Sequence, residues 1–212
     1  MSKPELSKRE LWNQRYASKE LVWSAGPNKL FSEEVQGLKP GKSIDIACGE
    51  GRNALWLAEQ GWDSTGIDFS DAAIDKGRQI AEKRGINVHW IADDASVYAL
   101  PKNEFDLVAI LYFHTEPAEM ENWLRNALEA VKQGGTFIYI GHDPSNIEHG
   151  VGGPQDPKFL PSSKEFTERM NGFEIVRAEV VNRPVVNEPG HGREELKGVA
   201  LDTLVRAIKR PK

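Results

Sequence analysis

The chain has 212 residues, of which 39% are hydrophobic and 28% charged, and its formal net charge is −5. This length and composition are typical of a soluble globular protein, so we expect a single domain over residues 1–212. The negative charge disfavours a nucleic-acid partner, and the longest apolar run (107–113) is too short to span a membrane. The single cysteine excludes a disulfide framework, so a cytoplasmic protein is expected.

Strand-like and helical segments alternate over the first two thirds of the chain. Short apolar runs predict strands, and helix signals lie between them. Ser70 can cap the helix "DAAIDKGRQIAEKR", Pro117 lies near the start of "AEMENWLRNALEAVKQ", and Gly134 and Gly135 end that helix. The expected strands are 43–47, 64–67, 88–91, 105–111 and 136–140. This alternation predicts an α/β fold with a doubly wound, mostly parallel sheet and helices on both faces.

The pattern changes towards the C-terminus. A short helix near 163–170 precedes two strand-like segments, 173–181 and 199–208, which we expect to pair antiparallel at one edge of the sheet. The loop 143–161 follows the fifth strand on the side where ligands bind. Long loops in compact domains are commonly functional, so we expect a substrate lid there.

The first strand runs into "GEGRNA", residues 49–54. Gly49 and Gly51 permit positive φ and close approach of the main chain to a ligand, and the helix that begins at Arg52 and Asn53 directs free N–H groups to the same place. Parallel sheets bind ligands at the carboxyl ends of their strands. A nucleotide-like ligand is therefore expected at this turn.

The same turn fits the fingerprint of an NAD(P)-dependent oxidoreductase. The spacing G-x-G-x-x-A, with Asp68 at the end of the second strand, is typical of dinucleotide-binding proteins. Asp45 inside the first strand argues against this interpretation. So does the final antiparallel pair, which stands where a separate substrate domain is expected.

Motifs in order along nearly the whole chain resemble those of class I S-adenosylmethionine (SAM)-dependent methyltransferases. "IDIACGEG" is similar to the first motif of that family, with Asp45 as its acidic residue and Ala47 in place of the commoner glycine; "GIDFS" and "IADDA" resemble the second and third motifs. "GVALDTLVRAIKR" resembles the final strand. The resemblance implies a Rossmann-like seven-stranded sheet whose last strand is antiparallel, SAM as cofactor and S-adenosylhomocysteine as product.

The resemblance also implies roles for single residues. Asp68 would accept hydrogen bonds from both ribose hydroxyls, beside Phe69. Asp94, in preference to the neighbouring Asp93, would face the adenine amino group, with Ala95 giving backbone contacts. An asparagine at position 68 keeps one acceptor but loses the charge, so its affinity for the cofactor is expected to lie between those of aspartate and alanine.

The N-terminal segment, residues 1–40, is expected to cap the cofactor. "GEGRNALWLA" and "WNQRYA...VW...PN" are similar to the tellurite-resistance and thiopurine methyltransferase branch of the family. Tyr16 and Trp23 from this segment, and Tyr112 beside the cleft, are candidates for contact with the cofactor. Aromatic residues in a helix are also common core residues, and both interpretations remain open for them.

Methyl transfer requires little beyond positioning, so a catalytic residue is not obligatory. If the acceptor must lose a proton, His114 and His142, after the fourth and fifth strands, are the candidates, and structural roles are as plausible for both. The motif "YFHT" in place of Asp/Asn-Pro-Pro-aromatic disfavours exocyclic amines, so a small molecule with an O, S or related nucleophile is expected. A non-catalytic SAM-binding protein is a further alternative. No metal is expected, because the candidate ligands lack metal-binding spacing: His142, Asp143, His149 and His191.

Overall fold

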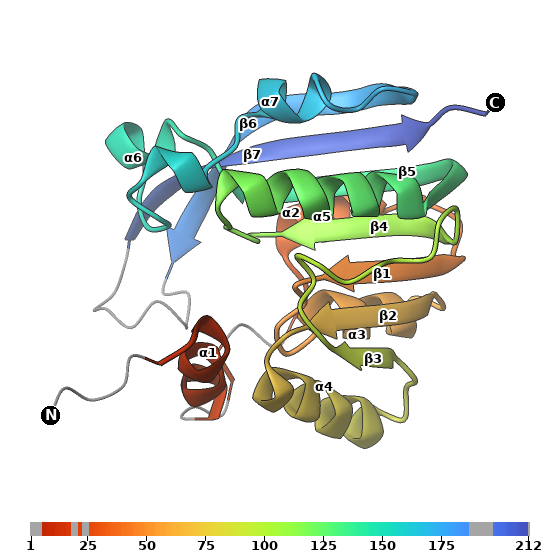
Figure 1. Ribbon diagram of the computed structural model, residues 1–212. Coiled ribbons are helices and arrows are strands. Elements are labelled where there is room, and N and C mark those ends of the chain that lie inside the picture. Colours follow the sequence, from red (N-terminus) through yellow and green to blue (C-terminus); the bar gives the residue numbers. More distant parts are fainter. Residues whose placement is uncertain (1–5, 18–20, 23–25, 187–196, 212) are drawn as a thin grey trace, which may run out of the picture.

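The computed structural model describes residues 6–17, 21–22, 26–186 and 197–211. A seven-stranded sheet runs through it in the order β3-β2-β1-β4-β5-β7-β6 (Figure 1). The first five strands pair in parallel, and β7 lies antiparallel between β5 and β6. The strands are β1 Lys42–Ile46, β2 Asp63–Asp68, β3 His89–Ala92, β4 Phe105–Leu111, β5 Val131–His142, β6 Phe173–Val186 and β7 Lys197–Lys209. The predicted sheet, including its antiparallel final pair, is confirmed.

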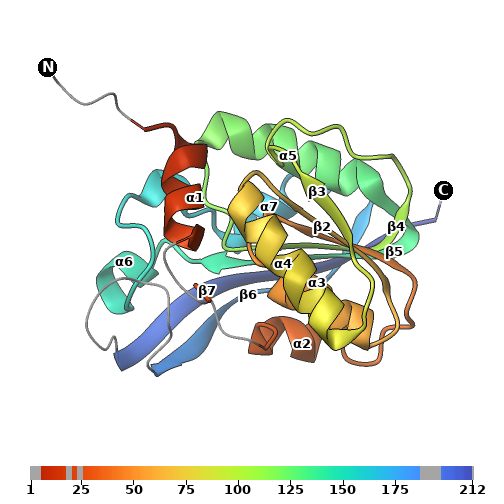
Figure 2. The same cartoon turned by 90° about the horizontal axis from the view of Figure 1, so that it is seen from below.

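Helices cover both faces of the sheet. α5 and α7 pack on one face and α2 and α3 on the other, as Figure 2 shows. α4 contacts β2, β3 and α3, and α1 packs on α4. The helices are α1 Lys8–Ala17, α2 Lys29–Val35, α3 Arg52–Glu59, α4 Asp71–Arg84, α5 Pro117–Ala130, α6 Asn146–His149 and α7 Ser163–Thr167, with a 3-10 turn at Pro157–Phe159.

Two apolar clusters fill the space between the sheet and its helices. The cluster under α5 and α7 is built on Trp123, Tyr139 and Phe166, and the cluster under α2 and α3 on Phe31 and Leu57. All five side chains are almost fully buried. Burying one large apolar side chain stabilises a fold by roughly 1.5–3 kcal/mol. Packing on both faces therefore holds the strands, and with them the strand ends, in fixed positions.

The predicted helix signals hold, with one exception. Ser70 caps α4, its Oγ accepting a hydrogen bond from the Ala73 amide at 3.2 Å. α5, however, ends at Ala130, before the predicted glycines, and Gly134 lies inside β5. The helix stops early because buried Val131 already pairs with β4 and the Lys209 ammonium group binds the last carbonyl groups of α5.

The expected N-terminal cap, residues 1–40, is described in part. α1 lies at the sheet edge where β1, β2 and β4 end, whereas α2 packs on a face of the sheet (Figures 1 and 2). Among the described residues, no helix is both long and apolar enough to cross a bilayer.

Candidate active site

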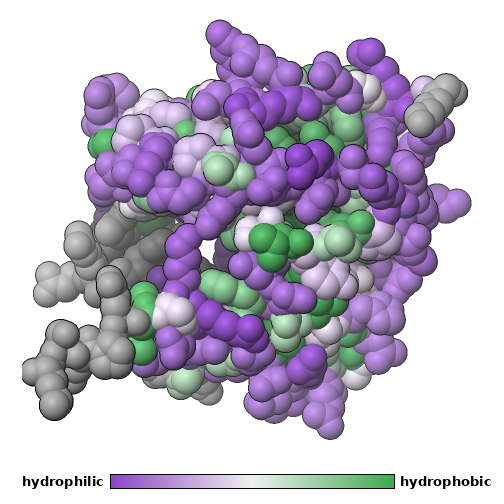
Figure 3. All heavy atoms as spheres, in the orientation of Figure 1, coloured by the Kyte–Doolittle hydropathy of each residue, from purple (hydrophilic) through white to green (hydrophobic). Residues whose placement is uncertain are grey.

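The carboxyl ends of β1, β2 and β4 meet at one edge of the sheet, beside the point where strand order reverses between β1 and β4. β6 ends and β7 begins at the same edge (Figure 1). Figure 3 shows a hollow in the surface between these strand ends and α1. Open α/β sheets bind ligands at such a position. The residues predicted from the sequence lie around this edge.

The turn after β1 has the left-handed backbone that its glycines allow. φ is 58° at Gly49 and 77° at Gly51, and Ala47 has a φ of 57° although it carries a Cβ. A Cβ on Gly51 would clash with the indole of Trp90, whose ring is also the nearest neighbour of a Cβ built on Gly77. The packing of Trp90 is therefore a second reason for glycine at position 51, besides the expected approach to a ligand.

Asp68 ties the glycine loop to the start of α4. Its Oδ2 accepts a hydrogen bond from the Gly49 amide at 2.8 Å, and its Oδ1 accepts one from the Ser70 amide at 2.9 Å. Burial raises the pKa of this carboxyl, and the two amides partly offset that effect. Each carboxylate oxygen can accept a further hydrogen bond, so this structural role is compatible with the predicted contact to a ribose.

Asp45 lies buried inside β1. Burial raises its pKa to about 7, while the charge of Arg52 and hydrogen bonds from the Ala54 amide and Asn53 act in the opposite direction. Its Oδ2 is buried and has no hydrogen-bond partner. A buried acceptor without a partner costs free energy, so this atom is suited to a donor supplied by a ligand.

The third predicted motif follows β3. Asp94 is exposed, and its Oδ1 accepts hydrogen bonds from the amide and hydroxyl of Ser96, at 2.9 and 2.7 Å. Its charge contributes to the raised pKa of Asp68, so the two carboxylates lie near each other. Ala95 and Phe69 are half-buried.

The N-terminal segment is attached to the glycine loop by a residue that the sequence analysis missed. The buried Glu50 carboxylate accepts hydrogen bonds from the Val22 amide, at 3.0 and 3.2 Å, and pairs with Lys76 at 3.3 Å. The signal in the sequence was the acid between the two glycines. Asn53, expected at the cofactor, accepts a hydrogen bond from the Asn28 amide at 2.9 Å, which is a second attachment of the same segment.

Tyr16 lies on α1 and is buried among Val22 and Ala73, with its ring stacked on Trp12 at 5.6 Å between centroids. Among the described residues, Tyr16 therefore packs between α1 and α4. Trp23, the other aromatic candidate of the segment, lies outside the described residues.

A second polar cluster occupies the ends of β4 and β5 and the start of β7. Tyr112 donates a hydrogen bond from its hydroxyl to Asp202 Oδ2 at 2.7 Å, and Arg183 Nε lies 2.6 Å from the same oxygen. His142 Nδ1 lies 3.3 Å from Asp202 Oδ1. The ring of His114 is stacked near that of His142, with 5.6 Å between centroids. The structure thus brings both predicted histidines together with Tyr112.

Burial and neighbouring charges shift the pKa values of His114 and Asp202. Burial, and then the charge of His142, lower the pKa of His114 to about 3, so His114 is neutral near pH 7. Burial raises the pKa of Asp202, but His142, Arg183 and Tyr112 more than compensate, so it stays below its usual range. The sequence analysis missed Asp202 and Arg183. Asp202 could have been found from its position as a lone acid inside the apolar strand "GVALDTLV".

The predicted lid, 143–161, is attached to β7 at its base. Asp143 Oδ2 accepts a hydrogen bond from the Thr203 hydroxyl at 2.7 Å, and Asn146 Oδ1 accepts one from the Leu201 amide at 2.7 Å. Further along, a Cβ on Gly153 would lie 2.5 Å from His142 Cδ2, so the loop backbone lies against this imidazole.

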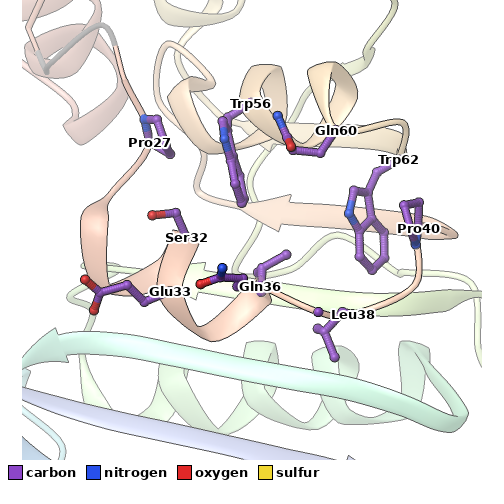
Figure 4. Close-up of a pocket in the computed structure, with 11 residues that line it drawn as sticks. Pro27, Ser32, Glu33, Gln36, Leu38, Pro40, Trp56, Gln60 and Trp62 are labelled. Atoms are coloured by element: carbon purple, nitrogen blue, oxygen red, sulfur yellow. The ribbon is translucent and has the colours of Figure 1, made fainter.

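Two further features lie apart from this edge. The groove in Figure 4, between α2 and α3, is lined by residues that include Trp56 and Trp62, and by none of the predicted cofactor residues. Among the residues that the structure describes, no three His, Cys, Asp or Glu side chains are grouped to hold a metal ion. His191 lies outside them.

Residues 44–135 match the family model Methyltransf_25, described as a methyltransferase domain. This segment, less than half of the chain, runs from β1 into β5 and contains the glycine loop, Asp68 and Asp94. The match and the fold support a class I SAM-dependent methyltransferase and do not favour an NAD(P)-dependent oxidoreductase.

Similar curated proteins are methyltransferases. The chain is 28% identical over 152 residues to 2-heptyl-1-hydroxyquinolin-4(1H)-one methyltransferase of Mycobacteroides abscessus, which covers 69% of this chain and 66% of that protein. It is 24% identical over 144 residues to ubiquinone biosynthesis O-methyltransferase of Coxiella burnetii, covering 66% of this chain and 62% of the relative. The matched regions thus span slightly less than two thirds of these relatives.

Solved structures share the fold at low identity. One concerns the conversion of a disulfide bond into a thioacetal group during echinomycin biosynthesis; it has a TM-score of 0.75 and 21% identity and covers 96% of this chain and 94% of that chain. TehB from Haemophilus influenzae has a TM-score of 0.67 and 17% identity, covering 94% of this chain and 67% of that chain. At these identities the likeness concerns the fold alone, and the narrower branch stays a prediction.

Proposed function

We propose that this protein is a SAM-dependent methyltransferase whose acceptor is a small molecule, and that it acts as a single domain in the cytoplasm. The observation that carries the proposal is the meeting of the glycine loop with Asp45, Asp68 and Asp94 at one sheet edge. SAM presents an ammonium group, a sulfonium, two ribose hydroxyls and an adenine amino group. Carboxylates complement every one of these donors and cations.

The residues present fit this cofactor. The unpartnered Oδ2 of Asp45 can receive a donor at the methionine end, and Asp68 retains acceptor capacity for the ribose. Asp94 Oδ1 is held by Ser96, which orients its other oxygen for the adenine amino group, with Ala95 and Phe69 beside it. When bound, SAM supplies a methyl group activated by its positively charged sulfur.

The remaining task of the chain is to position the acceptor and exclude water. The loop 143–161 lies against His142, which supports a role for it as a lid. The attachment of the N-terminal segment to Glu50 through the Val22 amide supports its role as a cap. The names of the relatives give an N-hydroxyquinolone and a step of ubiquinone biosynthesis, both small-molecule chemistry. These support an oxygen acceptor on a ring of comparable size.

Substitutions at two neighbouring aspartates test the proposed binding of this cofactor. In isothermal titration with S-adenosylhomocysteine, we expect Asp94→Asn to weaken binding about tenfold, the effect of roughly 1.4 kcal/mol. Asp93→Asn is the matched control, because Asp93 is the adjacent exposed carboxylate and its Oδ1 accepts a hydrogen bond from the Asp94 amide. Wild-type protein that binds NAD or NADP but not S-adenosylhomocysteine would contradict the proposal.

Turnover separates an enzyme from a non-catalytic SAM-binding protein. Wild-type protein is incubated with SAM and 2-heptyl-1-hydroxyquinolin-4(1H)-one, and mass spectrometry follows the methylated product and S-adenosylhomocysteine. Formation of both in equal amounts is the expected result. Tight S-adenosylhomocysteine binding without turnover of this or related hydroxylated rings would favour the binding protein.

A further inference from the structure

The polar cluster around Asp202 contains buried polar atoms that a purely structural network would be expected to satisfy. His142 Nδ1, Asp202 Oδ1 and His114 Nε2 are all buried without a hydrogen-bond partner. Such atoms are costly when nothing satisfies them. The first two face each other at 3.3 Å, so a proton on His142 Nδ1 serves both after a small shift of either side chain.

The surroundings of Asp202 favour its ionised, carboxylate form. Arg183 and the Tyr112 hydroxyl both bind its Oδ2, which keeps its pKa below the usual range despite burial and leaves Oδ1 for His142. An anion beside Nδ1 favours the Nδ1–H tautomer of the imidazole. The lone pair is then on Nε2, on the edge of the ring that points away from Asp202.

The surroundings of His142 distinguish it from His114. Among the described residues, the ionisable groups near His142 are Arg183 on β6, Asp202 on β7, Tyr112 and His114 after β4, and the adjacent Asp143. Asp143 is occupied by Ser145 and Thr203. His114 has no carboxylate hydrogen-bond partner among the described residues, and burial lowers its pKa to about 3, so it is a weak base.

Gly153 of the predicted lid lies against the imidazole of His142. A Cβ built on Gly153 would lie 2.5 to 2.9 Å from Cδ2, Cγ and Nε2 of the imidazole. Similar distances to three ring atoms place this glycine over the face of the ring. The in-plane direction of Nε2, along which a proton is accepted, is not the direction that Gly153 occupies.

We infer that His142, positioned by Asp202, is the general base for an acceptor hydroxyl of phenolic, enolic or N-hydroxy type. This inference rests on the proposed function. The O–H bond of the acceptor breaks and its proton moves to His142 Nε2. The oxygen forms a bond to the methyl carbon of SAM, and the carbon–sulfur bond breaks with its electron pair remaining on sulfur. An imidazole suits such hydroxyls because their pKa is closer to its own than that of an alcohol.

The experiment uses 4-nitrophenol, whose absorbance reports its ionisation, bound to protein saturated with S-adenosylhomocysteine. We expect the apparent pKa of the bound phenol to fall by about one unit in wild-type protein, because the phenolate pairs with protonated His142. The fall should disappear in His142→Asn and shrink in Asp202→Asn. His89→Asn, which changes an exposed histidine on β3, is the control and should behave as wild type.

The results distinguish a failure of the general-base inference from a failure of the proposed function. If S-adenosylhomocysteine binds but 4-nitrophenol does not, or binds with an unchanged pKa, the inference is wrong and the cofactor assignment stands. If S-adenosylhomocysteine fails to bind wild-type protein, the proposed function itself fails. Should the buried variants not fold, long-range ¹H–¹⁵N correlation spectra of the wild type give the tautomer of His142. The Nδ1–H form is expected, and the Nε2–H form overturns the inference.

Discussion

Replacing Asp68 by asparagine should harm the protein at least as much as replacing it by alanine. The reason is that both carboxylate oxygens accept a backbone amide, from Gly49 at 2.8 Å and from Ser70 at 2.9 Å. An asparagine offers one oxygen, so its NH2 group must face the other amide, donor against donor. This reverses the order expected from the sequence, in which asparagine falls between aspartate and alanine.

The magnitude follows from the two hydrogen bonds. A hydrogen bond to a charged group contributes roughly 1.5–3 kcal/mol, and an unsatisfied buried donor costs roughly 1–3 kcal/mol. The raised pKa of Asp68 shows that burial of its charge offsets part of this gain. We therefore expect Asp68→Ala to lower the free energy of unfolding by about 2–4 kcal/mol, with water able to reach the two amides, and Asp68→Asn by the same amount or more.

Urea unfolding measures the stability of both variants, and isothermal titration measures their affinity for S-adenosylhomocysteine. In the folded fraction, affinity should fall by about ten- to a hundredfold for both, corresponding to roughly 1.4–2.7 kcal/mol. Asp63→Asn, at the exposed start of the same strand, is the control and should change stability by less than about 0.5 kcal/mol. An asparagine variant as stable as wild type would show that the two amides do not depend on this carboxylate.

Three further changes test the loop, the buried acid and the lid. Ala47→Gly should stabilise the protein by about 0.5–1 kcal/mol in urea unfolding, because relief of a left-handed alanine outweighs the added freedom of the unfolded chain; a loss of stability would contradict this. The pKa of Asp45 is raised from 3.8 to about 7, so folding favours its protonated form. Stability should accordingly rise by up to about 4 kcal/mol as pH falls from about 7 to 4, and Asp45→Asn should flatten this profile. Gly153→Ala should destabilise by about 1–3 kcal/mol more than Gly172→Ala, which has a similar positive φ but open space at its Cβ; equal losses would show that His142 moves aside freely.

The sequence was sufficient for the sheet and for the backbone conformation of the glycine loop because those features depend on local signals. The alternation of apolar runs with capped helices predicts the parallel strands, and Ser70 begins its helix as expected. Gly49 and Gly51 predict positive φ, and the structure has it at both. Each of these inferences uses residues within a few positions of one another.

The features that were missed depend on contacts between distant segments. Asp202 meets Tyr112 across 90 positions, and Glu50 meets Val22 across 28. A local pattern can indicate that an acid is buried, as the apolar neighbours of Asp202 do, but it does not show which distant residue that acid binds. The reason for glycine at position 51 is likewise non-local, because Trp90 reaches it from β3. Similarly, α5 stops before its glycines because of Lys209 near the end of the chain.

The charges at the sheet edge support the proposal that the glycine loop binds SAM and not a dinucleotide. A pyrophosphate at the start of α3 would lie near the buried carboxyl of Asp45, which interacts with the charge of Arg52 on that helix. Like charges within a partly buried site repel strongly. The carboxylates at this edge favour a ligand that is cationic at its reactive sulfur and at its amino group. Among charged side chains, Arg52 acts against them at Asp45, and the pKa of that carboxyl remains raised all the same. Under the proposed function, the carboxylates therefore select the sign of the ligand's charge, and the glycines provide the space for it.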